Sequence, residues 1–146
     1  KKKLTVEVYL KKLNRLEVAT AANVSSQDTI HTEYLNILHH SMGDINLTLK
    51  SNDLFVQSLN GAGTIIKGEV GTIKSSIEGI SFLDTRECTS KNAFVDTHSP
   101  LDCYINATEI IFVKIYNSGN IYYVNEPNTL KEVNEKTGEG ELLLLQ

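Results

Sequence analysis

The amino-acid sequence predicts an all-β solenoid of about seven stacked coils with about 20 residues in each coil. Three observations predict this fold. Apolar and polar residues alternate over short runs, as they do in β-strands. No sustained run of apolar residues follows the i, i+3, i+4, i+7 spacing of a helix. Aliphatic residues that follow small or turn-forming residues recur at a nearly constant interval.

Strand-like alternation is clearest at residues 6–10, 45–49 and 111–115. These runs are rich in β-branched or aromatic residues and are bounded by Gly, Asn, Asp or Ser, which is typical of strands. We therefore expect a strand in each of them. Their apolar members are Val6, Val8 and Leu10, then Ile45, Leu47 and Leu49, then Ile111, Val113 and Ile115.

A short motif recurs along the chain, in which a small or turn-forming residue precedes an aliphatic residue by two or three positions. Successive copies are about 20 residues apart on average, and Ile80 fits the fourth copy as well as Phe82 does. One coil cannot cover its own apolar face, so coils with this period stack and bury a continuous column. The marker residues are Val24, Ile45, Ile65, Phe82, Cys103, Ile121 and Leu142.

A second apolar segment precedes most copies of the motif and predicts a second strand in each coil. We interpret the whole chain, residues 1–146, as one solenoid domain. These second segments are residues 13–18, 35–38, 54–58, 93–97, 111–115 and 130–133.

The glycine-rich stretch at residues 58–73 (SLNGAGTIIKGEVGTI) has three interpretations. A phosphate-binding loop would need a glycine motif that leads into a helix, and no helix start follows. A flexible linker would not carry Ile65, Ile66 and Val70. We interpret the glycines as corners of a coil, where a positive φ or a close backbone approach is needed.

Composition excludes some partners. The net charge is −4, and no Lys/Arg cluster lies beyond the first fifteen residues, so we expect no nucleic-acid binding. The longest apolar run, residues 142–145, is too short to cross a bilayer, and no leader-like apolar segment follows the first lysines. We therefore expect no membrane insertion and no signal peptide in this chain.

Cys88 and Cys103 are expected to be reduced thiols, with a single disulfide as the alternative.

Five segments resemble the bacterial head GIN domain family of auto-transporter adhesins. They are residues 5–24 (TVEVYLKKLNRLEVATAANV), the glycine-containing pair 42–49 and 61–70, residues 119–128 (GNIYYVNEPN) and residues 137–145 (TGEGELLLL). The resemblance spans nearly the whole chain. It implies a right-handed parallel β-helix in the cell envelope of Bacteroides-type bacteria, whether periplasmic, anchored in the outer membrane or on the cell surface. It carries over no functional residue.

Tyr104, Tyr116 and Tyr122 are the candidate binding residues. Alternation around Ile121 predicts that Tyr122 points outward and Tyr123 inward, with Tyr104 one coil earlier. An outward row of tyrosines offers flat apolar faces and hydroxyl groups to a sugar or a protein. The alternative is cross-strand stacking that only stabilises the sheet.

No metal site or cofactor is predicted. His39 and His40, with His31 upstream and Asp44 downstream, have ligand-type side chains, but adjacent strand residues point to opposite faces, so we expect a solvated polar patch there. Among the carboxylates, Glu78 and Asp102 would form an acid pair of the kind that polysaccharide-cleaving enzymes use if the register made them neighbours.

The sequence therefore favours a non-enzymatic extracytoplasmic interaction domain that binds a glycan or a surface protein. Two alternatives stay open. The leucines at 142–145 would let coils stack end to end in a structural self-assembly module, or would form a homo-oligomer contact. Carboxylates on adjacent coils would make the protein a carbohydrate-active enzyme.

Overall fold

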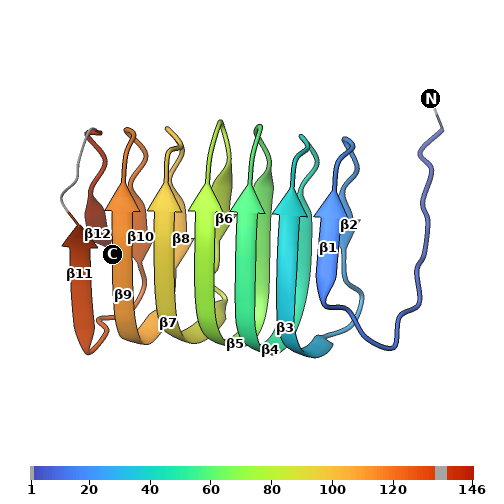
Figure 1. The fold of residues 1–146 in the computed structure, drawn as a ribbon, viewed down its shortest axis with the longest axis horizontal. Helices are drawn as coiled ribbons and strands as arrows, with labels where there is room; N and C mark the ends of the chain where they lie inside the picture. Colours follow the sequence, from blue (N-terminus) through green and yellow to red (C-terminus); the bar gives the residue numbers. More distant parts are fainter. Residues whose placement is uncertain (1, 134–137) are drawn as a thin grey trace.

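The computed structural model describes residues 2–133 and 138–146, and over these residues the chain forms one twelve-stranded sheet wound into a solenoid (Figure 1). All strand pairs are parallel, and the described residues contain no helix. The strands are β1 (Arg15–Val18), β2 (Val24–Ser25), β3 (Ile30–His39), β4 (Ile45–Ser58), β5 (Gly63–Ile77), β6 (Phe82–Asp84), β7 (Cys88–Thr97), β8 (Cys103–Ile105), β9 (Ala107–Ile115), β10 (Ile121–Tyr123), β11 (Thr129–Val133) and β12 (Leu142–Leu144).

Each coil has a front and a back (Figure 1). The front carries β1, β3, β7, β9, β11 and the second halves of β4 and β5, whereas the back carries β2, β6, β8, β10, β12 and the first halves of β4 and β5. The chain runs up the front, crosses at the upper turns and returns down the back while it advances toward the C-terminus, which makes the winding right-handed. The predicted β-solenoid of about seven coils is confirmed.

The back column differs from the predicted one at two positions. Ile45 pairs with Thr64, and Thr64 pairs with Leu83, so Ile65 and Phe82 each lie one residue away from the column. Thr64 points inward because its hydroxyl forms a hydrogen bond with Nδ1 of buried His39 at 3.2 Å. The other five markers occupy the column as predicted, which therefore contains Val24, Ile45, Thr64, Leu83, Cys103, Ile121 and Leu142.

Phe82 is outside the column because its ring covers a glycine of the preceding coil. A Cβ at Gly63 would lie 2.3 Å from Cζ of Phe82, so the ring occupies the space that a side chain at Gly63 would need. This is a cross-strand aromatic contact over a strand glycine, of the type that compensates for the missing side chain.

The front column is made of aliphatic residues in strict register. Leu35 pairs with Leu54, Leu54 with Ile73, and all three are completely buried. The predicted second segments are confirmed as front strands, but residues 72–77 were missing from that set and form the front part of β5. The column contains Leu35, Leu54, Ile73, Ala93, Ile111 and Leu130.

Side-chain oxygens of Asn and Asp connect neighbouring coils where the back strands begin. Oδ1 of Asn23 accepts a hydrogen bond of 2.9 Å from the backbone N–H of Asp44, whose own Oδ1 accepts one of 2.9 Å from Gly63. Asp102 and Asn120 repeat this arrangement in the last coils. These bonds satisfy backbone donors that the short back strands leave unpaired.

The glycine-rich stretch at 58–73 contains corners and strand, as predicted. Gly68 has a φ of 107°, and a Cβ there would lie 2.1 Å from the carbonyl oxygen of Leu49 in the preceding coil. Both the positive φ and the close backbone approach require glycine at this position. Strand β5 continues through the corner, so the stretch is one coil of the solenoid.

The strand predicted at residues 6–10 is wrong. Residues 2–10 belong to no strand, and Figure 1 shows the N-terminal segment standing apart from the first coil. Val6 and Val8 are 74% and 72% exposed. Alternation alone does not make a strand, because each strand needs a neighbour for its hydrogen bonds. Within the described residues β1 pairs with β3 alone.

Candidate ligand-binding face

Two of the predicted tyrosines lie together on the back of the solenoid. Tyr104 of β8 pairs in register with Tyr122 of β10, and their rings stack with centroids 5.4 Å apart. The guanidinium of Arg86 lies 4.0 Å from the Tyr104 centroid, and Arg86 also forms an ion pair with Asp84. Tyr123 points inward and is 8% exposed, as predicted.

Tyr116 does not join this pair. It follows β9 at the upper turn, on the other side of the coil, and stacks on His98 with centroids 4.3 Å apart. The structure therefore divides the predicted set into a back-face pair and a separate tyrosine. Both stacking contacts link neighbouring coils, which is the arrangement expected for cross-strand stabilisation. A binding role for these three residues stays a prediction.

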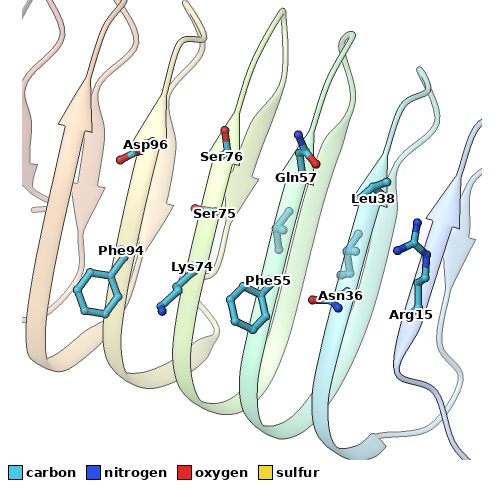
Figure 2. A pocket seen from close by; sticks show the side chains of 12 residues that line it. Arg15, Asn36, Leu38, Phe55, Gln57, Lys74, Ser75, Ser76, Phe94 and Asp96 are labelled. Atoms are coloured by element: carbon cyan, nitrogen blue, oxygen red, sulfur yellow. The ribbon is translucent and has the colours of Figure 1, made fainter.

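A longer row of outward side chains, not recognised in the sequence, follows the front of the solenoid. Its members stand one residue after the front column, at the same register position in five successive coils. Figure 2 shows three of them, Phe55, Lys74 and Phe94. We call the whole row the aromatic–cation row. It consists of Phe55, Lys74, Phe94, Phe112 and Lys131.

Ring and ammonium groups contact each other along this row. Nζ of Lys74 lies 5.7 Å from the ring centroid of Phe55 and 5.9 Å from that of Phe94, between the two rings. Phe94 and Phe112 are tilted against each other at 6.3 Å, and Nζ of Lys131 lies 5.5 Å from Phe112. At exposed sites a cation–π contact contributes about 0.5–1 kcal/mol, so these contacts hold the side chains in an ordered row.

Polar side chains flank the row in the neighbouring outward positions. A depression of about 540 Å³ lies around Phe55, Lys74 and Phe94, whose side chains Figure 2 shows on neighbouring front strands. Arg15 and Asn36 continue the row toward the N-terminal coils. The depression thus combines apolar ring faces with hydrogen-bonding groups, the mixture found in ligand sites. Its other outward polar residues are Gln57, Ser76 and Asp96, whereas Ser75 lies at the inward register position of Val56 and Val95.

The signal for this row was present in the sequence. The segments LFVQS, AFVDT and IFVKI each place a phenylalanine directly after an inward residue. Lys74 lies in residues 72–77, the front segment that the predicted set of second strands lacked. The row of rings and ammonium groups was therefore incomplete in the sequence pattern. Applying the repeat of about 20 residues to outward positions would have found it.

His39 and His40 point to opposite sides, as predicted, but the expected solvated polar patch is wrong at His39. His39 is buried in the interior, and His40, next to it, is partly exposed. Burial lowers the pKa of His39 below its usual value of 6.5. In the described part of the chain no group of three or more His, Cys, Asp or Glu residues is arranged to hold a metal ion.

The remaining chemical candidates lie apart from the front face. Cys88 and Cys103 are free and buried, and burial raises their pKa to about 12 and about 11. Glu78 and Asp102 are not register neighbours, because β6 pairs Asp84 with Tyr104 and so aligns Asp102 with Phe82. Asp102 instead accepts the backbone N–H of Asn120 at 2.8 Å.

The fold and its outer face define the class of protein, a parallel β-solenoid that presents ladders of side chains on a flat sheet. A family model described as "Putative auto-transporter adhesin, head GIN domain" matches residues 1–127, and the chain belongs to this family. The family resemblance of the sequence is thereby confirmed.

The chain is similar to a solved structure over most of its length. The crystal structure of a putative adhesin from Bacteroides fragilis matches with a TM-score of 0.86 and 20% sequence identity. The match covers 91% of this chain and 61% of that chain, so this chain spans less than two thirds of the neighbour. At this identity the likeness shows the fold alone. No curated protein sequence matches the chain.

Proposed function

We propose that this chain is a non-catalytic adhesion domain that acts outside the cytoplasm and binds a glycan or a protein surface through its front face. The observation that carries the proposal is the aromatic–cation row, five outward side chains at one register position. Membership of the adhesin family and the description of the Bacteroides fragilis neighbour support it.

The front face suits recognition because the backbone fixes the spacing of its side chains. Neighbouring coils are about 4.8 Å apart, so the rings and ammonium groups of the row follow one another at a constant interval. Phe55 is 41% exposed although it is large and apolar, and Lys74 keeps its ring in place from the next coil. A ligand that binds such an ordered surface loses little free energy in arranging the side chains.

An extracytoplasmic location follows from the adhesin description of the family, which also favours binding over catalysis. The described residues include no helix long and apolar enough to cross a membrane. Fractionation of the native host, followed by protease treatment of intact cells, identifies the compartment.

Binding to arrays of purified glycans and surface proteins tests the proposal. We expect a Phe55→Ala/Phe94→Ala double variant to lose binding relative to the unmodified protein, while its thermal unfolding shows that the solenoid is retained. The matched variant is Tyr104→Ala/Tyr122→Ala, which removes the stacked pair on the back. Loss of binding in the tyrosine variant alone would assign recognition to the back face and refute the front-face proposal.

A further inference from the structure

Lys74 and Lys131, on the front face, form no ion pair with any carboxylate whose side chain the structure describes. In the described part of the chain the ion pairs are Arg15–Glu17, Lys67–Glu87 and Arg86–Asp84. Lys74 and Lys131 instead hold their Nζ atoms against phenyl rings. Their charge is therefore available to an anion that comes from outside.

We propose that the aromatic–cation row binds an acidic polysaccharide whose chain lies along the solenoid axis, an inference that rests on the proposed function. Lys74 and Lys131 are three coils apart, about 14 Å at the usual spacing of parallel strands, and Phe94 and Phe112 lie between them. The row thus presents cation, ring, ring, cation along one line.

Each part of this arrangement matches a part of an acidic sugar chain. The ring faces and edges of Phe94 and Phe112 contact the apolar faces of sugar rings. The two ammonium groups at either end bind carboxylate or sulfate groups that the chain carries at intervals. The ligand runs along the axis because the row crosses the strands.

The neighbouring outward positions contain both acids and hydroxyl or amide groups. Asp96 is paired in register with Lys114, so the charge of Asp96 faces a cation of the next coil. Asp53 lies beside Thr72, on the other side of the row. Carboxylates accept hydrogen bonds from sugar hydroxyls, and amides both donate and accept them, whereas the carboxylates of an acidic peptide form fewer such bonds and are repelled by Asp53 and Asp96. This favours a glycan over an acidic peptide.

Binding of alginate, a polymer of uronic acids, is the test, with neutral dextran and poly-L-glutamate as comparison polymers. In a Lys74→Gln/Lys131→Gln variant we expect alginate to bind about tenfold more weakly at low salt, because two exposed ion-pair contacts are lost. The control is Lys50→Gln/Lys91→Gln, which makes the same change in net charge at exposed lysines outside the row and is expected to alter affinity less than about twofold.

The outcomes separate this inference from the proposed function. If dextran binds as tightly as alginate, and Phe94→Ala but not the lysine variant weakens binding, the acidic ligand is refuted while the front-face site stands. If poly-L-glutamate binds as tightly as alginate, the ligand is not specifically a glycan and the inference fails. If no polymer, glycan or protein binds the front face, both the inference and the proposed function fail.

Discussion

The alternation of inward and outward side chains along β4 makes a quantitative prediction for neighbouring residues. Leu54 is completely buried, and Phe55, the next residue, is 41% exposed. Replacing each with Ala removes an apolar side chain from the same strand, once from the interior and once from the surface. Residue size alone predicts the larger loss for Phe55, whereas the structure predicts the larger loss for Leu54.

The expected cost at Leu54 follows from its neighbours. Leu35 and Ile73 cover it from the coils on either side, and both are completely buried, so the cavity left by Leu54→Ala is closed to water. Buried Leu→Ala replacements cost about 3–5 kcal/mol when the surroundings relax little. That is a large part of the roughly 5–15 kcal/mol by which domains are stable. For a chain of this size it corresponds to a decrease in melting temperature of about 10 °C.

Phe55→Ala should cost about 1 kcal/mol, because it removes one exposed cation–π contact and part of a ring surface that is already in water. Urea unfolding followed by far-ultraviolet circular dichroism measures both free energies and both m-values. The m-value also shows whether the coils unfold together, which is not guaranteed in a repeat protein. An equal or larger loss of stability for Phe55→Ala would contradict the register of β4.

Three further predictions concern a corner, a buried histidine and the cysteines. Gly68→Ala should lower the melting temperature by several degrees, because a Cβ at φ 107° would lie 2.1 Å from the carbonyl oxygen of Leu49. The pKa of His39 is lower in the folded state than its unfolded value of 6.5, so the contribution of neutral His39 to stability is present above about pH 6.5 and is lost as the pH falls. The urea concentration at the midpoint of unfolding should therefore decrease as the pH is lowered toward about 5. In the His39→Gln variant this decrease should be smaller. Cys88 and Cys103, buried and with pKa values raised to about 12 and about 11, should react with a thiol reagent in urea and hardly at all in the native protein at neutral pH.

The period of about 20 residues was visible in the sequence because the interior of each coil needs an aliphatic residue at a fixed place. The two errors in the back column, Ile65 and Phe82, come from neighbouring apolar residues that fit the pattern equally well. In one case a hydrogen bond to buried His39 selects Thr64 for the interior. In the other, the space above Gly63 accommodates the Phe82 ring outside. Both choices depend on contacts between coils, which a linear pattern does not contain.

The candidate site was harder to predict than the fold for a related reason. Tyr104 and Tyr122 were correctly placed on adjacent coils because each follows a residue of the back column. The front row required the register of five coils at once, and its centre, Lys74, lies in a segment with a weak apolar signal. Glycine and serine at 71, 75 and 76 make residues 72–77 look like a loop, although Ile73 and Ile77 are completely buried.

The coils differ in length, but the register of the front strands is kept. A regular row of outward side chains can therefore form on the front face although the sequence repeat is irregular. Front-column residues are separated by 19, 19, 20, 18 and 19 positions from Leu35 to Leu130. The 18-residue spacing comes with a shift in register between Ser90 and Asn92, near the start of β7 and before the residues of the front column. The extra residue is accommodated near the corner, so residues 93–97 and 111–115 still pair one to one. The inward column therefore determines the alignment of the coils, and the outward row can change its chemistry without changing the winding. For that reason the substitutions in the row are expected to alter binding while leaving the solenoid folded.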